Sequence, residues 1–355
     1  MNILVFGATG SIGKQTIDVI HKLKFSLVGI SFYHNEKVAA KIKTKYKFSP
    51  INSAKSNVKS YEDLIVKSKP DMIVNAIVGF AGLEITLLAI KHKIDIALAN
   101  KESLVSAGRF IIPMAKKNKI NIYPIDSEHA SLQQILKQVK KPFKQLYITA
   151  SGGPFYHYSS QQLAKVSYKE TIKHPTWDMG WKISIDSATL INKCFEMIEA
   201  YWYFGTKHIT PLYHPQSLIH ALVDFKDKIK YAFISKPDMH LPIELALTKF
   251  KNKSEYVKPF IKAKHVLESI NQEKYKPIKW AYKCLDDTKS PLPIIINAAN
   301  DWATMAFKNG NIKFVEIIQI INQCIVRFKN IKIDNIRQVF QLNDRIISYL
   351  NNLQK

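Results

Sequence analysis

The chain has 355 residues, which exceeds the size at which a single hydrophobic core stops growing, so we expect two or three domains. Its hydrophobic content of 46% and aromatic content of 11% are typical of a folded protein and exclude a disordered one. The formal net charge of +24 would suit a nucleic-acid binder, but the lysines are scattered as singles and pairs without an Arg-rich run. We therefore expect no nucleic-acid partner, although the charge can draw in a polyanionic cofactor or substrate.

The cysteines and the apolar segments bear on the cellular compartment. The three cysteines lie far apart and form no CxxC pair, which predicts reduced thiols and no cysteine metal cage. The chain opens directly into an apolar strand and leaves no room for a signal peptide. Residues 73–90 approach the length of a membrane span, but Asn75, Glu84 and two glycines interrupt them. We expect a cytoplasmic protein with no membrane partner.

The first predicted strand, 3–6, leads into the glycine-rich turn GATGSIG at 7–13 and then into a helix that runs to residue 20. Glycines at this spacing let the chain bend and bring helix N–H groups against a pyrophosphate. The glycine pattern alone is a weak signal. Its place between a strand and a helix supports a dinucleotide site.

A second strand is predicted at 25–31, and the loop after it bears on the choice of dinucleotide. NAD-binding proteins commonly carry an acidic residue here to hold the ribose 2′-hydroxyl. This chain has FYHN at 32–35, with Lys37 just beyond. Neutral and basic donors favour a 2′-phosphate, so we predict NADPH, with contacts from His34 and Asn35. The alternative is that the loop only meets solvent.

The next predicted strands, 72–77 and 94–98, are separated by a helix expected at about 82–91. Alternating strands and helices of this kind predict a parallel, doubly wound sheet. Asn100, Lys101 and Glu102 follow the second of these strands at its carboxyl end, where such sheets bind ligands. They are cofactor candidates, although an ordinary helix start would look the same.

The strand predicted at 122–125 is followed by two carboxylates. Because residues i and i+2 of an extended chain point the same way, we expect Asp126 and Glu128 to face one side. With Glu196 they form an oxygen-only set, which suits Mg²⁺ or Mn²⁺ and not zinc. The alternative is that Asp126 or Ser127 only caps the helix that follows.

Further candidates are a serine and two histidines. Ser151 lies between a predicted strand, 147–150, and two glycines, where its hydroxyl and nearby N–H groups can bind a phosphate. A tight turn is the alternative. His174 and His214 are each followed by proline, which holds them extended, and they are the histidines we expect to act in chemistry. A lone histidine is more often structural.

The segment 174–204 combines a predicted mobile loop with a helix. Pro175 and Gly180 interrupt the loop and Trp177 lies between them, as is typical of a lid over a water-sensitive reaction. We expect Asp186 or Ser187 to cap the helix that follows and leave N–H groups for an anion.

The helix after this cap is expected to carry an acidic stripe. Asn192, Glu196 and Glu199 fall on one stripe at helical spacing, with Lys193 beside it, and most other positions are apolar. A helix that is apolar nearly all round is buried, so the stripe is expected to face a cavity. The alternative is a surface helix whose polar face meets solvent.

Nine stretches, in order along nearly the whole chain, resemble the 1-deoxy-D-xylulose 5-phosphate reductoisomerase family. They are GATGSIG (7–13), NAIVGFAGL (75–83), ALANKESLVSAG (97–108), PIDSEHASLQQ (124–134), TASGGPF (149–155), HPTWDMGWKISIDSATLINKCFEMIEA (174–200), HPQSLIHALVDF (214–225), PDMHLPI (237–243) and NAANDWATMAF (297–307).

The resemblance implies an NADPH-dependent oxidoreductase that needs a divalent cation (Mg²⁺, Mn²⁺ or Co²⁺). It rearranges 1-deoxy-D-xylulose 5-phosphate by a retro-aldol and aldol sequence and reduces the resulting aldehyde to 2-C-methyl-D-erythritol 4-phosphate, in non-mevalonate isoprenoid biosynthesis. It also implies a homodimer.

The fold expected from this resemblance is α/β, with three domains. An N-terminal doubly wound (Rossmann-type) parallel sheet at 1–125 binds NADPH. An α+β catalytic domain at 126–255 binds metal and substrate and carries a flap at 174–186. A Lys-rich connector and a C-terminal helical bundle occupy 256–355.

The resemblance also assigns residues to roles. The metal ligands implied are Asp126, Glu128 and Glu196. The phosphate- and substrate-binding positions implied are Ser151, Gly152, Ser187, Asn192 and Lys193. The substrate-side catalytic positions, with the two flap residues last, are Ser127, His174, His214, Trp177 and Met179. The cofactor contacts implied are Thr9, Gly10, Ser11, Ile12, Asn100, Lys101, Glu102 and Gly180.

Three residues depart from the family pattern, although none is a predicted metal or phosphate ligand. Trp181 stands where a basic or small residue is more common, Cys194 where a glycine is usual, and His240 where arginine is common. Two other functions remain open from the residues alone. One is a simple NADP-dependent dehydrogenase of another phosphorylated hydroxy-carbonyl, which needs no carboxylate trio, and the other is an RNA-binding protein that exploits the positive charge.

Overall fold

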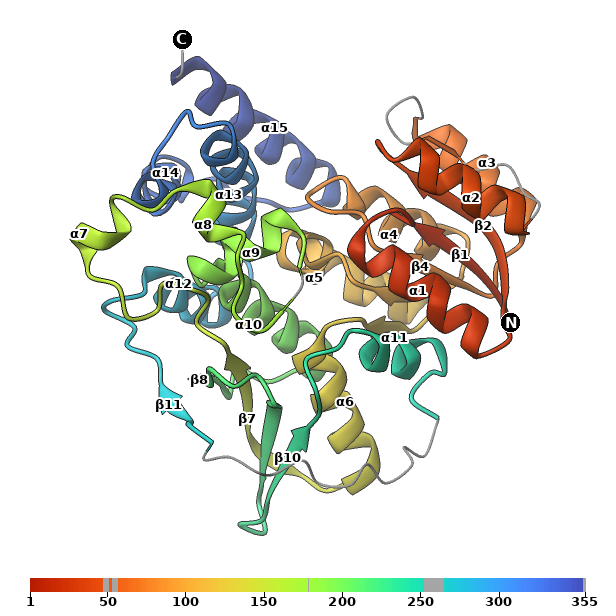
Figure 1. The fold of residues 1–355 in the computed structure, drawn as a ribbon, viewed down its shortest axis with the longest axis horizontal. Helices are drawn as coiled ribbons and strands as arrows, with labels where there is room; N and C mark the ends of the chain where they lie inside the picture. Colours follow the sequence, from red (N-terminus) through yellow and green to blue (C-terminus); the bar gives the residue numbers. More distant parts are fainter. Residues whose placement is uncertain (47–50, 53–56, 178, 252–264, 354–355) are drawn as a thin grey trace. The chain divides into compact units, whose positions relative to one another are not determined.

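The computed structural model describes residues 1–46, 51–52 (backbone alone), 57–177, 179–251 and 265–353 (Figure 1). The described residues form two compact units. The first unit comprises Met1–Ser103, Ile111–Lys137 and the described part of Asp238–Pro259, and the second comprises Leu104–Phe110, Gln138–Pro237 and the described part of Phe260–Lys355. The boundary predicted at 255/256 lies outside the described residues, and the division into three domains stays a prediction.

The first unit contains a six-stranded sheet of order β3-β2-β1-β4-β5-β6 in which all the described pairs are parallel. Its strands are β1 (Asn2–Phe6), β2 (Ser26–Phe32), β3 (Ile51–Asn52), β4 (Met72–Asn75), β5 (Asp95–Leu98) and β6 (Ile122–Pro124). The strand order reverses between β1 and β4, which is the switch point where doubly wound sheets bind ligands. The predicted doubly wound fold is confirmed.

The helices that lie wholly or partly in the first unit are α1 (Ser11–Lys22), α2 (Glu36–Tyr46), α3 (Val58–Ser68), α4 (Gly82–Lys91), α5 (Lys101–Lys117), α6 (Ser127–Val139) and α11 (His240–Leu247). Helix α1 packs against α11 and on β1 and β2, whereas α3 and α4 pack together and α4 lies on β4 and β5. The strands are mostly apolar, and Ile3 to Phe6 of β1 are all fully buried.

The second unit contains a mixed five-stranded sheet of order β10-β9-β7-β8-β11. The strands are β7 (Phe143–Ala150), β8 (Ile209–Tyr213), β9 (Ile219–Phe225), β10 (Lys230–Ile234) and β11 (Glu268–Ser269). β7 pairs with β8 in parallel and with β9 in antiparallel fashion. This sheet is the predicted α+β part of the chain.

The helices of the second unit are α7 (Ser160–Leu163), α8 (Tyr168–Thr171), α9 (Trp181–Ala188), α10 (Ile191–Phe204), α12 (Lys276–Asp286), α13 (Leu292–Lys308), α14 (Phe314–Phe328) and α15 (Ile336–Leu353). The first three of them are short. The C-terminal helices, drawn in blue in Figure 1, pack together as predicted, with α13 against both α14 and α15. Of the helices that the structure describes, none combines the length and apolar character of a membrane span.

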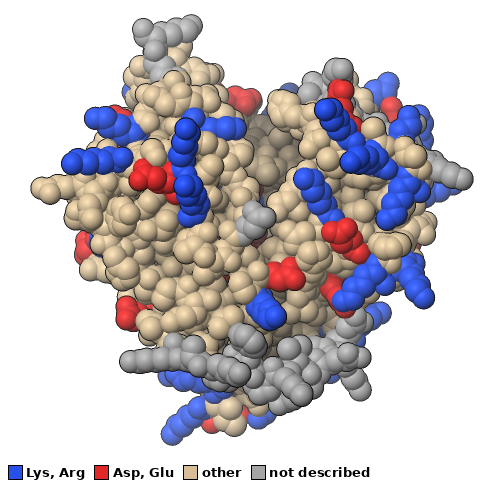
Figure 2. Space-filling view, viewed as in Figure 1, with Lys and Arg blue, Asp and Glu red and all other residues tan. Residues whose placement is uncertain are grey.

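On the face drawn in Figure 2, the charges follow the sequence pattern. Lysine and arginine side chains are spread there singly and in small groups, with acidic side chains among them. A spread of this kind lacks the concentrated stripe by which proteins track a phosphate backbone.

Candidate active site

The turn after β1 approaches the end of β4 closely. Gly7 has φ +81°, and a Cβ there would lie 2.4 Å from the carbonyl oxygen of Ala76. Only glycine fits a position with both constraints. The turn leads through Thr9 into α1, whose N-cap is Gly10 with no side-chain cap, so the first N–H groups of the helix at Ser11 and Ile12 have no side-chain acceptor there.

The loop predicted to select NADPH begins one residue later than expected, because β2 extends to Phe32. The ring of Tyr33, 57% exposed, lies 3.9 Å from that of His34. Asn35 uses its side chain as a helix cap, since its Oδ1 accepts from the backbone N–H of Val38 at 3.1 Å. The 2′-phosphate contact of His34 and Asn35 stays a prediction.

Asn100 and Glu102 hold the turn that follows β4. Asn100 is the N-cap of α5, and its Nδ2 donates to the carbonyl oxygens of Ile77 and Gly79, both at 2.9 Å. Glu102 accepts from the N–H of Gly79 at 3.0 Å. The two residues therefore serve as the helix start that the sequence left open, and they also hold the turn after β4, which is one of the two strands at the switch point. Their cofactor contact is a separate matter that stays a prediction.

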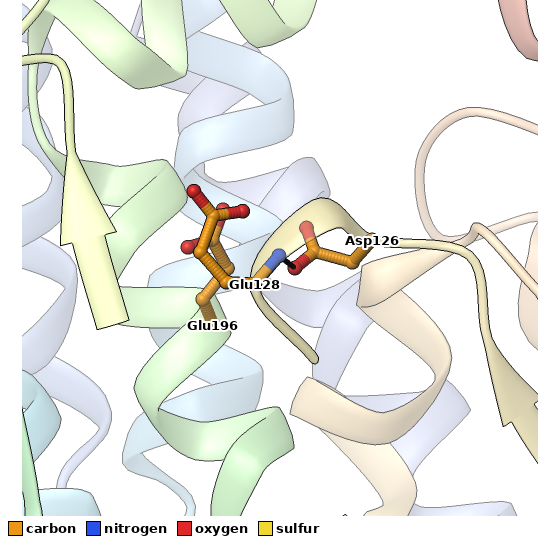
Figure 3. Close-up of side chains that lie close together, drawn as sticks. All are labelled: Asp126, Glu128 and Glu196. Carbon is orange, nitrogen blue, oxygen red and sulfur yellow. Dashed lines mark hydrogen bonds between the residues drawn. The ribbon is translucent and has the colours of Figure 1, made fainter. Parts of the chain in front are cut away.

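Asp126 begins α6. Its Oδ1 accepts from the backbone N–H groups of Glu128 (drawn in Figure 3) and His129, both at 3.1 Å, and its Oδ2 pairs with Lys101. Ser127 Oγ donates to Glu128 at 2.6 Å. The argument from strand alternation was wrong, because β6 ends at Pro124 and Glu128 lies in the first turn of a helix. Asp126 therefore caps α6, as the alternative had it, and the Asp126 and Glu128 carboxylates still lie near each other.

The prediction that α10 is a buried helix is confirmed, and the cavity that its acidic stripe was expected to face stays a prediction. Glu196 is 1% exposed, and it accepts from Asn192 Nδ2 and from Lys193 Nζ. Lys193, 3% exposed, also donates to the carbonyl oxygen of Thr149 in β7. A buried ammonium and a buried carboxylate are compatible with a low-dielectric interior only when paired in this way. Glu199, one turn on, is also buried.

The predicted cap of α10 was wrong. Asp186 and Ser187 lie inside α9, and α10 begins after Leu190, whose φ of +61° places it in the left-handed region without a side-chain cap. Two helices separated by Thr189 and the left-handed Leu190 replace the expected single helix. The N–H groups at this start still have no side-chain acceptor from the N-cap residue.

His174 joins three predicted site residues. Its Nε2 lies 2.9 Å from Ser151 Oγ and 3.5 Å from Ser187 Oγ. Its Nδ1 accepts from the backbone N–H of Trp177 at 3.1 Å and of Thr176 at 3.2 Å, so a neutral ring carries its proton on Nε2. Burial lowers the pKa of His174 to about 4. The ring is therefore a neutral donor toward the two serines at neutral pH.

The predicted flap lies against β9. The ring of Trp177 meets that of His220 edge-on at 5.9 Å, and Trp177 and Met179 are half-buried. Gly180 is the N-cap of α9, which begins at Trp181, so the C-terminal part of the segment predicted as flap is helical. The lid role stays a prediction.

His214 is bound on both ring nitrogens by backbone. Its Nδ1 lies 2.7 Å from the carbonyl oxygen of Val266, and its Nε2 accepts from the N–H groups of Leu218 and Ile219 at 3.2 and 3.1 Å. The side chain is fully buried. These contacts match the structural reading of this histidine, and its substrate-side role stays a prediction.

Gly152 occupies a tight turn beside Ser151 in a left-handed backbone conformation. Its φ of +80° favours glycine, and a Cβ would lie 2.6 Å from the ring of Tyr213 and 2.8 Å from that of Tyr156. The tight turn that the sequence left open is present. The aromatic residues that surround it carried no signal in the sequence.

A buried polar cluster around Asp186, the residue before Ser187, was not predicted from the sequence. Asp186 accepts from Lys182 Nζ and from Asn300 Nδ2, both at 2.8 Å, and Lys182 also pairs with Asp301 at 3.2 Å. The spacing of Lys182 and Asp186 on one helix was a usable signal. The partners on α13 are more than a hundred residues away, and sequence spacing cannot pair them.

The three departures from the family pattern fit locally. Lys308 Nζ lies 4.3 Å from the ring centroid of Trp181, a cation–π contact. Cys194 is fully buried in α10. His240 Nδ1 pairs with Asp238 at 2.6 Å. All three cysteines of the chain are free and buried.

Three family models match the chain. The model described as 1-deoxy-D-xylulose 5-phosphate reductoisomerase matches residues 3–65 and 51–108, the C-terminal domain model of the same enzyme matches 122–204, and a second model, DXP reductoisomerase C-terminal domain, matches 234–348. Together they span most of the chain.

Curated relatives and solved structures agree with these models. The 1-deoxy-D-xylulose 5-phosphate reductoisomerase of Malacoplasma penetrans (strain HF-2) is 43% identical and covers 99% of this chain and 95% of its own length. That of Mycoplasmoides gallisepticum (strain R(low / passage 15 / clone 2)) is 41% identical over 98% and 96%.

Among solved structures, the reductoisomerase from Zymomonas mobilis in complex with NADPH is 29% identical, with a TM-score of 0.84 over 100% of this chain and 99% of that chain. A DOX-P reductoisomerase in complex with NADPH, fosmidomycin and magnesium is 27% identical, with a TM-score of 0.89 over 100% and 98%. A match of whole chains at these identities extends beyond the doubly wound fold that many dehydrogenases share, and on this ground the chain belongs to the 1-deoxy-D-xylulose 5-phosphate reductoisomerase family.

Proposed function

We propose that this chain, as a homodimer, converts 1-deoxy-D-xylulose 5-phosphate to 2-C-methyl-D-erythritol 4-phosphate in non-mevalonate isoprenoid biosynthesis, using NADPH and a divalent cation. The observation that carries the proposal is the match of the whole chain to named reductoisomerases. A relative solved with NADPH, fosmidomycin and magnesium supports the two cofactors. A simple dehydrogenase would have no use for the carboxylates described next.

The proposed cation ligands are Asp126, Glu128 and Glu196, a set of carboxylates whose chemistry suits a metal ion. Oxygen-only donors are those that Mg²⁺ and Mn²⁺ prefer. Asp126 is held by the start of α6 and Glu196 by its neighbours on α10, so these two carboxylates are oriented before a cation arrives. Orientation of this kind supports the assignment.

The proposed phosphate site consists of Ser151, Ser187, Asn192 and Lys193. The hydroxyls of both serines lie near His174 Nε2, and a phosphate is bound best by such donors together with an ammonium. Anchoring the phosphate holds the rest of a small substrate in place while carbon–carbon bonds break and form.

The proposed chemistry divides between cofactors and side chains. When bound, NADPH supplies the hydride and the divalent cation polarises the oxygens of the substrate. His174 holds its proton at Nε2, toward the serines and therefore toward the phosphate end. Trp177 on the predicted flap excludes water while the aldehyde awaits reduction.

The test is NADPH oxidation with 1-deoxy-D-xylulose 5-phosphate, in the presence and absence of Mg²⁺ or Mn²⁺. We expect metal-dependent oxidation, and Glu196→Gln is expected to lower kcat by on the order of a hundredfold, because several kcal/mol of charge stabilisation is lost. Glu84→Gln on α4 is the control, since Glu84 is half-buried but assigned no role. Metal-independent oxidation, unaffected by Glu196→Gln, would instead indicate a simple dehydrogenase.

A further inference from the structure

An aromatic cluster supports the turn that carries Ser151 and Gly152. The ring of Tyr156 stacks on that of Tyr213 in β8, with centroids 3.8 Å apart and planes 6° from parallel. Tyr275, before α12, stacks on the same Tyr156 ring at 5.1 Å and 11°. Segments far apart in the sequence thus converge on one side chain that follows the turn by a few residues.

Hydrogen bonds hold the backbone of Tyr156, as stacking holds its ring. Its carbonyl oxygen accepts from the hydroxyl of Tyr275 and from Lys274 Nζ, the latter at 3.0 Å. Lys274 Nζ also lies 5.2 Å from the ring centroid of Tyr275, within cation–π distance. His157, the next residue, contacts the hydroxyl of Tyr213 at 3.1 Å. The carbonyl group of Tyr156 and the side chain of His157 are therefore both hydrogen-bonded to neighbours.

The turn rests directly on this cluster. A Cβ on Gly152 would overlap the rings of both Tyr213 and Tyr156. Gly152 and Gly153 both have positive φ, 80° and 63°, and consecutive glycines on their own leave a chain many conformations. The rings block one side of the turn and remove much of this freedom. They thereby determine where Ser151 Oγ lies relative to His174.

We propose that Tyr156, Tyr213 and Tyr275 are positioning residues that hold the Ser151–Gly152 turn in the conformation that binds the substrate phosphate. This inference rests on the proposed phosphate-binding role of Ser151. A turn held in its bound conformation loses less entropy when the phosphate arrives, so the cluster raises affinity without touching the substrate.

The test compares Tyr156→Ala with Tyr156→Phe. The ring alone makes the stack, so Tyr156→Phe is expected to keep the wild-type KM for 1-deoxy-D-xylulose 5-phosphate within about twofold. Tyr156→Ala is expected to raise that KM about tenfold while KM for NADPH and kcat change much less. Tyr349→Ala on α15 is the matched control, because it removes a ring that contacts Phe328, away from the turn, and leaves this KM unchanged.

A double variant shows whether Tyr156 acts through Ser151. Ser151→Ala with Tyr156→Ala is expected to raise KM no further than Ser151→Ala alone, since residues acting as one unit are not additive. If Tyr156→Ala fails to fold, Tyr275→Phe removes only the hydroxyl that bonds to Tyr156, and a severalfold rise in the same KM is expected. An unchanged substrate KM in these variants, or an equal fall in kcat and in affinity for NADPH, overturns the inference. An inactive wild-type enzyme would instead overturn the proposed function.

Discussion

At the scale of single residues, the chemistry of the site depends on which side chains are held uncharged or paired in the interior. His174 is the clearest case. Its Nδ1 is occupied by backbone N–H groups and its Nε2 faces Ser151, while burial lowers its pKa from 6.5 to about 4. A histidine in this environment is a fixed donor near neutral pH, and it begins to take up a proton only well below pH 6.

This shift makes stability depend on pH. Because the pKa of His174 is lower in the folded state, the unfolded chain binds the proton first, and the contribution of His174 is present above pH 6.5 and lost as the pH falls to about 4. We expect the free energy of unfolding of the wild type to fall more steeply in this window than that of His174→Gln, by up to about 1.4 kcal/mol per pH unit. Urea unfolding at several pH values measures it. Parallel curves would contradict the shift.

Lys193 gives a second prediction. Lys193→Met leaves the buried Glu196 without its ammonium, and breaking a buried pair costs about 3–5 kcal/mol. Added Mg²⁺ is expected to recover part of this loss, because a cation on Glu196 replaces the missing charge. Thermal unfolding with and without Mg²⁺ measures both effects, and Lys329→Met, at an exposed position, is the control. Equal destabilisation with and without Mg²⁺ would count against the metal role of Glu196.

At the scale of elements, α9 is short and depends on its neighbours for orientation. It carries Ser187, and the adjacent Asp186 is bonded to Asn300 of α13 and to Lys182 one turn earlier. Because successive helical residues are fixed to one another in angle, the anchor at Asp186 also sets the direction of Ser187.

Asn300→Ala tests this anchor. It removes a donor from the buried carboxylate of Asp186, so we expect a loss of about 1–3 kcal/mol in the free energy of unfolding. Asn311→Ala, in the exposed loop after α13, is the control and is expected to change stability by less than about 0.5 kcal/mol. Denaturant unfolding of the two variants makes the comparison. Equal effects would mean that Asn300 does not anchor α9.

The elements also differ in how well the sequence predicted them. The helix expected at 82–91 has those bounds, because an apolar run between turn signals leaves little choice. The start of α10 was misplaced, because the break between α9 and α10 is made by Leu190 in a left-handed conformation, and a leucine is not a turn signal. Local propensity does not predict a helix break that tertiary packing imposes.

At the scale of the whole molecule, ligand binding is expected to stabilise the fold. A ligand present at a hundred times its Kd adds about 2.7 kcal/mol to the free energy of unfolding. We expect NADPH to raise the melting temperature more than NADH at equal concentration, because no carboxylate follows β2 before Glu36 and the loop offers His34 and Asn35 to a 2′-phosphate. Thermal unfolding with each dinucleotide measures the difference. A larger shift with NADH would reverse the assignment.

The sequence by itself determined the family, the doubly wound sheet and the residue types of the site, because glycine turns, apolar strands and carboxylates are local features read one segment at a time. Asp126, Glu196 and His174 were all singled out in this way, and their roles in the site stay predictions. Only the tertiary structure decided that His214 bonds to backbone on both nitrogens, that Asp186 is anchored from α13, and that Tyr156 stacks between distant segments. Some of these contacts join residues more than a hundred positions apart. The folding of the chain, not local propensity, brings such residues together.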